Sequence, residues 1–227
     1  ELMFDPYHVV EIDGVQVGFI AATLEGTKSI VPPVLGDITF LDEADSVARW
    51  VDVLKERGVE AFVLLLHEGG WHEGGPNDCN NLYGPVVDVV ERLPQEIDVV
   101  LAGHTHQSYV CQREDVLLVS GGGYGQWLTK VELRLSRDTG DIVARAAENF
   151  AVHSDDGVDA EVAAIVGRYA EEIGPIARRD VGEVQGPILR APLATGESPL
   201  GSVIADAQRY ATKADLAFMN LGGIRDD

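Results

Sequence analysis

The sequence predicts an α/β fold in which buried strands alternate with amphipathic helices. Apolar runs of strand length occur at 61–66 (AFVLLL) and 97–103 (IDVVLAG). Each run follows a stretch whose apolar residues recur at helical spacing, at 42–60 and at 84–93. This alternation is typical of a sheet with parallel strands, in which ligands bind beyond the carboxyl ends of the strands.

The first part of the chain predicts a hairpin followed by a helix. Residues 9–23 (VVEIDGVQVGFIAAT) contain alternating β-branched residues around an Asp-Gly pair, which suits a tight turn between two strands. Acidic residues begin the segment 42–60, and basic residues and Gly58 close it, as expected at helix ends. The apolar residues of this helix share one face: Ala44, Val47, Trp50, Val51 and Leu54.

The second half of the chain has a different pattern. From 115 to about 152, short apolar runs and turn signals predict a second, antiparallel sheet. Residues 158–173 predict a connecting helix, because their apolar residues recur at helical spacing between polar stretches. The remaining residues predict a helix at 199–213, a strand at 215–220 and a final turn, LGGIRDD. We expect these last elements to be too few for an independent core.

Charge restricts the possible partners. The chain has 38 acidic and 17 basic residues and a formal net charge of −21 at pH 7, so most of its surface repels a nucleic-acid polymer. A small phosphate ester remains compatible, because a bound cation or a single arginine outweighs distant charges at short range. No window approaches the roughly 18 consecutive apolar residues of a membrane-spanning helix. Nucleic-acid polymers and a membrane span are therefore not expected.

The two cysteines, Cys79 and Cys111, each lie in a predicted polar loop near a histidine-bearing stretch. Either they form one disulfide between two loops that meet, or they are unrelated buried thiols. We favour the disulfide, which would indicate an oxidising, extracytoplasmic location.

Histidines directly follow both predicted buried strands. His67 comes after the first strand, and His104 and His106 form a Gly-His-Thr-His sequence after the second. A histidine at a strand end is held rigidly within reach of substrate, and neutral imidazole is the commonest transition-metal ligand. A His-x-His pair alone is more often a pair of loop histidines, but a third histidine at the neighbouring strand end favours a metal site. The one-residue spacing lets His104 and His106 diverge toward two neighbouring ions.

Several stretches, in this order, resemble the calcineurin-like metallophosphoesterases, specifically the two-domain bacterial 5′-nucleotidases. The stretches are DPYHVVEIDGVQVGFIAAT, LLLHEGG, LAGHTHQ, GESPLGSVIADA and NLGGIR, and the resemblance covers essentially the whole chain. It implies the C-terminal part of a catalytic domain at 1–152, with a four-layer α/β/β/α sandwich. It also implies a linker helix at 153–176 and the beginning of an α/β nucleotidase C-terminal domain, which binds substrate, at 177–227.

The resemblance implies a two-metal phosphohydrolase that cleaves nucleotide phosphomonoesters. His67 and His104 would bind one divalent ion and His106 the other, with Zn²⁺, Mn²⁺, Co²⁺ or Mg²⁺ as the candidates. Two ions about 3.5–4 Å apart would clamp the phosphoryl oxygens and lower the pKa of a bridging water toward about 7. The alternatives are a 2′,3′-cyclic nucleotide phosphodiesterase, a nucleotide pyrophosphatase, and a catalytically inactive module that binds metal or nucleotide.

The resemblance places substrate-binding residues in the NLGGIR stretch. Gly222 and Gly223 would let backbone N–H groups approach an anion, and Arg225 would donate several hydrogen bonds to a phosphate or ribose. Asn220 would hydrogen-bond the base or the sugar. The residues alone favour a simpler interpretation, a tight turn with a solvent-facing arginine.

The earlier metal motifs of that family, Asp-x-His, Gly-Asp and Gly-Asn-His-Glu, have no counterpart in this chain in suitable surroundings. Three histidines cannot by themselves saturate two divalent ions. We therefore expect an internal fragment of a longer enzyme, inactive alone. Because the loss of leading strands would expose a sheet edge, a second chain is expected to cover that edge.

Overall fold

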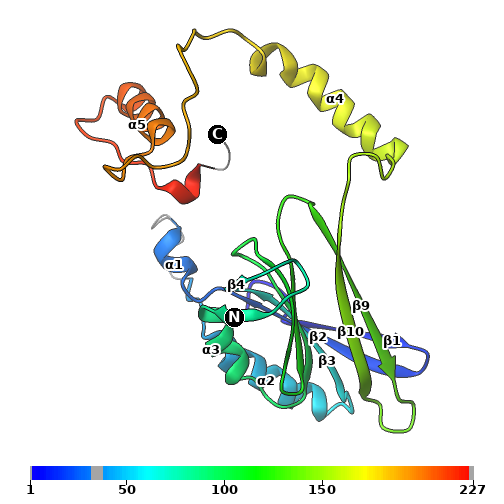
Figure 1. The fold of residues 1–227 in the computed structure, drawn as a ribbon. Helices are drawn as coiled ribbons and strands as arrows, with labels where there is room; N and C mark the ends of the chain where they lie inside the picture. Colours follow the sequence, from blue (N-terminus) through cyan, green and yellow to red (C-terminus); the bar gives the residue numbers. More distant parts are fainter. Residues whose placement is uncertain (1, 32–37, 225–227) are drawn as a thin grey trace. The chain divides into compact units, whose positions relative to one another are not determined.

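The computed structural model describes residues 2–31 and 38–224, and the chain divides into two compact units. Unit 1 ends at Gly157 and unit 2 begins at Val158. Figure 1 follows the chain through both units.

Unit 1 contains all the strands of the described residues. Its elements are, in chain order, β1 (Tyr7–Ile12), β2 (Val15–Thr23), α1 (Thr27–Ile30), α2 (Glu43–Lys55), β3 (Ala61–His67), β4 (Trp71–Glu73), β5 (Asn80–Tyr83), α3 (Pro85–Glu91), β6 (Ile97–Ala102), β7 (Ser108–Arg113), β8 (Val116–Gly121), β9 (Trp127–Leu135) and β10 (Ile142–Ala151).

A six-stranded mixed sheet forms the centre of unit 1, with the strand order β1-β2-β3-β6-β8-β7. The strands β2, β3, β6 and β8 run parallel, and the edge strands β1 and β7 are antiparallel to their neighbours. Asp13 and Gly14 connect β1 to β2, both with positive φ, as a tight hairpin turn requires. The predicted hairpin, the two buried strands and the mixed α/β class are confirmed. The expected second chain at a sheet edge stays a prediction.

The sheet is covered differently on its two faces (Figure 1). Helices α2 and α3 pack on one face, where Val47, Val51 and Leu54 of α2 belong to the larger core cluster and Trp50 packs against it. The β9–β10 ribbon covers the other face over a second cluster that includes Val17, Val63 and Val119. Unit 1 thus has three layers, α/β/β. The fourth layer of the expected sandwich is not among the described residues of this unit.

The prediction of a separate sheet from 115 to about 152 is wrong for its first strand, β8, which belongs to the central sheet. Strand β8 joins the central sheet beside β6, and β7 pairs with β8, so only β9 and β10 form a separate antiparallel pair. The physical reason is that β8 is buried on both faces: Leu118 packs in the helix-side cluster, whereas Leu117 and Val119 pack under the ribbon. Cys111 also lies in the fully buried part of β7 and not in a polar loop.

A largely buried ion pair connects the central sheet to the β9–β10 ribbon. Asp98 on β6 accepts hydrogen bonds from Arg145 Nη1 at 3.0 Å and from the Phe62 backbone N–H at 3.1 Å. The Asp98 side chain is 10% exposed, and its burial raises its pKa to about 6.

Asp98→Asn is expected to remove a pH dependence of stability. The pKa of Asp98 is higher in the folded state than in the unfolded state, so the folded state holds the carboxyl proton more tightly. This difference stabilises the fold fully below pH about 4, where Asp98 is protonated in both states. The stabilisation is lost as the pH rises through about 6. The unfolding free energy of the wild type, minus that of the variant, should fall by about 2 kcal/mol between pH 4 and 7. Urea unfolding at stepped pH measures this difference, and a difference that stays constant would contradict the prediction.

Unit 2 contains the helices α4 (Ala160–Ala177) and α5 (Pro199–Thr212) and the short 3-10 helix η2 (Leu221–Gly223). Helix α4 begins after Asp159, whose side chain accepts from the N–H groups of Glu161 and Val162, and it continues past Pro175 to Ala177. The expected end at 173 is therefore too early, because the proline removes only one backbone donor near the end of the helix. The described residues include no helix long and apolar enough to cross a membrane.

The predicted strand at 215–220 is wrong. This segment has no regular structure, and Leu216 and Phe218 are 74% and 87% exposed. A strand needs a hydrogen-bonded neighbour, and the described part of unit 2 offers none. Buried residues of this unit, within the described range, are Ser198, Gly201 and Ile224, so unit 2 holds little core.

Candidate functional site

The predicted metal-binding histidines lie at the carboxyl ends of two neighbouring parallel strands. His67 ends β3, and His104 and His106 lie in the turn after β6, which pairs with β3. The ring centroids of His67 and His104 are 5.1 Å apart, with the rings edge to face. His106 instead packs against Tyr124, with 5.1 Å between ring centroids. All three histidines are exposed; the rings of His67 and His104 contact each other, and the ring of His106 contacts Tyr124.

The backbone of the histidine turn is strained. His104 and His106 both have left-handed backbone conformations, with φ of 64° and 55°. The Thr105 N–H donates to the Gly103 carbonyl at 2.7 Å, which closes a three-residue turn around His104. Such turns with positive φ are rare and strained for residues other than glycine, and backbone strain concentrates at functional sites. The strain indicates that the ring orientations are held by the surrounding structure.

Close packing between the turn and the segment after β3 supplies that support. A Cβ on Gly69 would lie 2.2 Å from the Gly103 carbonyl oxygen and 2.4 Å from Thr105 Oγ1. Thr105 Oγ1 donates to the Gly70 carbonyl at 2.9 Å, and the Gly103 N–H donates to the Glu68 carbonyl at 3.2 Å. Only a glycine at position 69 permits this approach, and the two segments therefore hold each other.

A buried carboxyl group and a buried phenol lie near the segment that follows β3. Glu68 is 4% exposed, and its Oε1 accepts from the Gly69 N–H at 2.7 Å. Tyr109 on β7 is fully buried, and burial raises the pKa of its hydroxyl to about 12. His72 packs against Tyr109 with 5.7 Å between ring centroids. Glu68 and Tyr109 thus add two buried polar groups next to the segment that follows β3.

The imidazoles fit the ligand chemistry of a transition-metal ion. His67 and His104 offer two ring nitrogens from adjoining strands, and His106 offers a third from the same turn. Imidazole is a ligand for Zn²⁺ and for related divalent ions, and rigid support of the rings favours binding. A complete four-ligand shell for each of two ions needs further ligands beyond these three.

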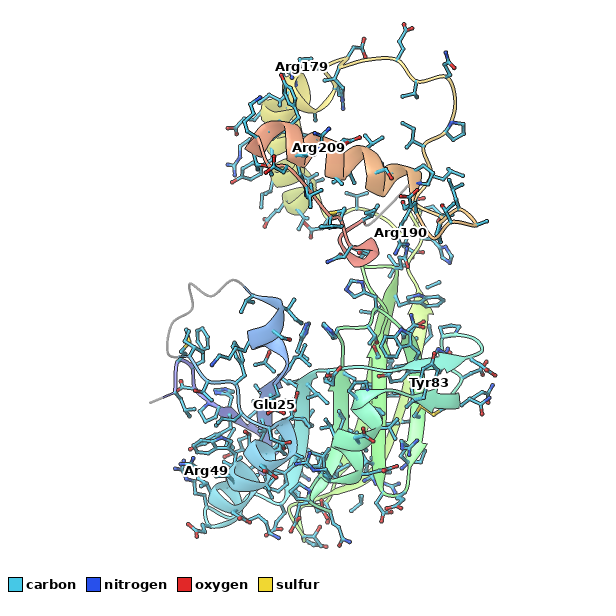
Figure 2. The ribbon with its side chains drawn as sticks, turned by 90° about the vertical axis from the view of Figure 1, so that its left-hand side faces the viewer. Glu25, Arg49, Tyr83, Arg179, Arg190 and Arg209 are labelled. Carbon is cyan, nitrogen blue, oxygen red and sulfur yellow. A yellow bond between two sulfur atoms is a disulfide. The ribbon has the colours of Figure 1, made fainter. Side chains whose placement is uncertain are left out.

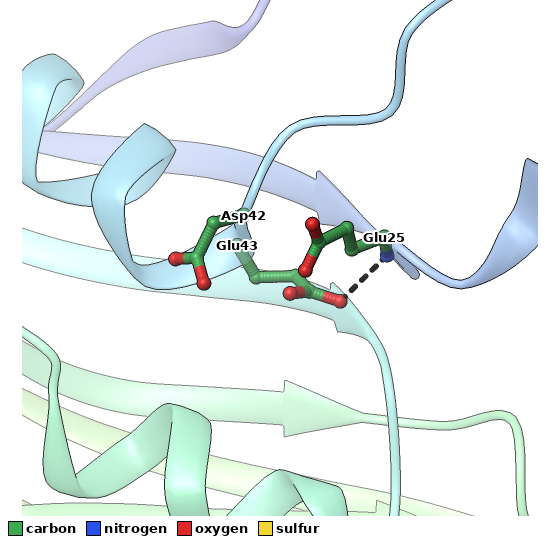
Figure 3. A group of neighbouring side chains, drawn as sticks. All are labelled: Glu25, Asp42 and Glu43. Carbon is green, nitrogen blue, oxygen red and sulfur yellow. Dashed lines mark hydrogen bonds between the residues drawn. The ribbon is translucent and has the colours of Figure 1, made fainter.

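A second group of possible metal ligands has a structural explanation. Within the described ranges, Glu25, Asp42 and Glu43 are the one group of three or more His, Cys, Asp and Glu residues whose ligand atoms all lie within 4.8 Å of each other (Figure 3). Asp42 caps α2 and accepts from both terminal nitrogens of Arg92, at 2.8 and 2.7 Å, and these bonds hold its pKa below the usual value. Glu43 accepts from the Glu25 N–H at 2.8 Å. The group anchors a loop to the start of α2.

The disulfide between Cys79 and Cys111 is confirmed, with a Cα–Cα distance of 5.1 Å. It ties the β4–β5 hairpin, which follows His67 in the chain, to the buried strand β7. The sequence suggested the disulfide, but it did not predict the hairpin.

Tyr124 contacts the histidine turn and was not among the residues predicted from the sequence. It has a φ of 58° and packs against His106, and a Cβ on the preceding Gly123 would lie 3.0 Å from His106 Cγ. The available signal was the glycine cluster GGGYG at the end of an apolar run, which permits a close backbone approach.

The predicted substrate-binding stretch lies in unit 2. Asn220 Oδ1 accepts from the Gly223 N–H at 2.6 Å, and this bond closes the turn that contains η2. Gly222 and Gly223 are exposed. Arg225 lies outside the described residues. The structure therefore brings Asn220 and Gly223 together, and the Asn220 amide oxygen already accepts a hydrogen bond within its own turn.

Comparisons with known proteins relate this chain to nucleotidases. Residues 175–227 match the 5′-nucleotidase C-terminal domain. The chain is 33% identical over 222 residues to Endonuclease YhcR of Bacillus subtilis, with 97% of this chain and 18% of that protein covered. It is 30% identical over 245 residues to Cell wall protein Lmo0130 of Listeria monocytogenes, with 99% and 31% covered.

A solved structure shows the same fold. The 5′-nucleotidase precursor from Thermus thermophilus superposes with a TM-score of 0.68 at 24% sequence identity, with 92% of this chain and 42% of that chain covered. The chain spans less than a third of the length of the two sequence relatives and less than half of this structure. It is thus a distant relative of 5′-nucleotidase phosphohydrolases over part of their length.

Proposed function

We propose that the intact protein is a metal-dependent phosphohydrolase that cleaves nucleotide phosphomonoesters. The observation that carries this proposal is the pairing of His67 and His104 at the ends of parallel strands, with 5.1 Å between their ring centroids. His104 lies in a turn with a strained backbone. The relationship to 5′-nucleotidases supports the reaction class.

In this proposal, His67 and His104 bind one divalent ion and His106 binds the second. When bound, the ions polarise the phosphoryl oxygens and activate water. The interlocked glycine and threonine contacts keep the imidazoles in position. Further ligands come from parts of the intact protein outside these residues.

The domain assignment and substrate-binding residues are part of the same proposal. Residues 1–152 contribute to the catalytic domain, 153–176 link it to the next domain, and 177–227 begin the substrate-binding domain. There, Asn220, Gly222, Gly223 and Arg225 bind the nucleotide, with the two glycines and the arginine on its anionic groups. The match of 175–227 to a 5′-nucleotidase C-terminal domain supports this assignment.

A second candidate is phosphodiester hydrolysis. One relative of this chain is an endonuclease. The net charge of −21 disfavours a long polymer, so a cyclic nucleotide is the better diester substrate to test.

His67→Ala and His104→Ala are each expected to lower kcat/KM of the intact protein at least about 100-fold, because each removes a ligand from the same ion. AMP, 2′,3′-cyclic AMP and bis(p-nitrophenyl) phosphate, each assayed with Mn²⁺, Co²⁺ or Zn²⁺, distinguish the candidate reactions. Chelation of the metal should abolish turnover. His8→Ala, at an exposed position on β1, is the matched control and should retain activity. Absence of turnover with all three substrates and metals would contradict the enzyme proposal.

We also propose an extracellular, cell-surface or periplasmic location. The disulfide requires an oxidising compartment to persist, and one relative is a cell wall protein.

A further inference from the structure

The histidine turn is held from two sides by different segments of unit 1. On the side of His104, the segment after β3 packs against the turn, and Thr105 Oγ1 donates to the Gly70 carbonyl at 2.9 Å. That segment leads into the hairpin that carries Tyr83 (Figure 2). On the side of His106, the contacts come from the loop between β8 and β9, residues 122–126. His104 and His106 therefore have separate supports.

Two hydrogen bonds fasten the residue after His106 to the end of β8. The Gln107 carbonyl accepts from the Ser120 hydroxyl at 2.6 Å and from the Gly122 N–H at 3.0 Å. Ser120 is 2% exposed, and its own carbonyl accepts from the Asn149 side-chain amide at 3.0 Å. These bonds fix the backbone that leads out of the histidine turn.

The imidazole of His106 packs against two consecutive residues of the β8–β9 loop. A Cβ on Gly123 would lie 3.0 Å from His106 Cγ and 3.3 Å from Nδ1, so the Gly123 backbone lies directly against the ring. The Tyr124 ring meets the same imidazole edge to face, with 5.1 Å between ring centroids and 75° between ring planes. Aromatic rings favour this geometry. The two contacts restrict the rotation of the His106 ring.

Tyr124 occupies its position at a cost to the fold. Its φ of 58° lies in the left-handed region, which favours glycine, and its two neighbours in the chain are glycines. The residue is 68% exposed, so burial of its ring does little to offset this strain. A glycine would relieve the strain, and a tyrosine retained in such a place beside a histidine points to a role of its side chain at the site.

We propose that Gly123 and Tyr124 are positioning residues that hold the His106 imidazole as a ligand of the second ion, separately from the contacts that hold His67 and His104. This inference rests on the proposed phosphohydrolase function, in which His106 binds that ion. Gly123 acts by permitting the close approach of the ring, and Tyr124 acts through its own ring. A change in this loop should therefore weaken one ion and spare the other.

The test measures metal binding to the intact protein by equilibrium dialysis against Mn²⁺. Tyr124→Ala is expected to weaken the binding of one of the two ions at least about tenfold and that of the other less than about twofold. Tyr124→Phe keeps the ring contact and should bind both ions as the wild type does. Tyr83→Ala is the matched control, because Tyr83 is also exposed but its ring contacts Trp71 instead of a histidine.

Double variants identify the ion that is weakened. Combined with His106→Ala, Tyr124→Ala should add less than about a twofold further loss, because its effect passes through that imidazole. Combined with His67→Ala, it should keep its full effect on the second ion. Equal weakening of both ions by Tyr124→Ala, no weakening of either, or full additivity with His106→Ala would overturn the positioning role while leaving the phosphohydrolase function intact.

The position of the imidazole can also be measured without metal. Carbon relaxation in the metal-free protein should show larger motion of the His106 ring in Tyr124→Ala than in the wild type, and unchanged motion of the His67 and His104 rings. Gly123→Ala should displace the same ring, because Gly123 has no positive φ and its added Cβ meets His106 first. If the wild type binds no ion, the proposed function fails. Unchanged motion of the His106 ring in Tyr124→Ala would overturn the positioning role in either case.

Discussion

Gly69→Ala is expected to destabilise unit 1 by about 1–3 kcal/mol and to weaken metal binding in the same variant, because the added Cβ forces the histidine turn to move. The Cβ would lie 2.2 Å from the Gly103 carbonyl oxygen, a backbone atom that cannot rotate away. Either the segment after β3 or the turn that carries His104 must shift. Urea unfolding measures the free energy, and equilibrium dialysis against Mn²⁺ or Zn²⁺ measures the affinity, which should fall at least about tenfold.

Gly75→Ala is the matched control for this experiment. It lies in the segment between β4 and β5, where an added Cβ would meet its nearest atom, Asp78 Oδ2, at 3.4 Å, an ordinary contact distance. Its unfolding free energy should stay within about 0.5 kcal/mol of the wild type. If Gly69→Ala is as stable as the control and binds metal equally well, the interlocked packing does not hold the histidine turn.

Loss of the Cys79–Cys111 disulfide is expected to lower the unfolding free energy of unit 1 by about 4 kcal/mol, because the bond closes a long loop in the unfolded chain. The two cysteines are 32 residues apart, and the bond also anchors the β4–β5 hairpin to the core. The double variant Cys79→Ala, Cys111→Ala should show this loss in denaturant unfolding.

Chemical reduction of the wild type should produce the same loss without a change of sequence. It thereby separates the effect of the bond from that of altered packing at the buried Cys111. Thiol titration of the folded, unreduced protein should find no free cysteine. Two reactive thiols there would contradict the disulfide and would also remove the main support for an extracytoplasmic location.

Several elements could be predicted because their signals are local. The Asp-Gly turn between β1 and β2 depends on two residues that accept positive φ, and the apolar face of α2 depends on residues within four turns of helix. The apolar runs of β3 and β6 likewise identify strands that are buried on both faces.

Other elements could not be predicted because their structure depends on distant neighbours. Strand β8 has the same apolar character whether it forms a new sheet or joins β6, and only the burial of both its faces places it in the central sheet. The segment 215–220 has strand-like residues, but it finds no partner strand in the described part of unit 2 and stays irregular.

At the candidate site, the sequence is sufficient to place histidines at the ends of two buried strands and to suggest a bond between the cysteines. Only the tertiary structure brings the ring centroids of His67 and His104 to 5.1 Å from each other. It also packs Gly69 against the Gly103 carbonyl and stacks the Trp71 ring on that of Tyr83. The physical reason is range. Strand ends follow from local apolar pattern, whereas contacts between residues 12 to 37 positions apart depend on which strands pair and how closely their connecting loops can approach.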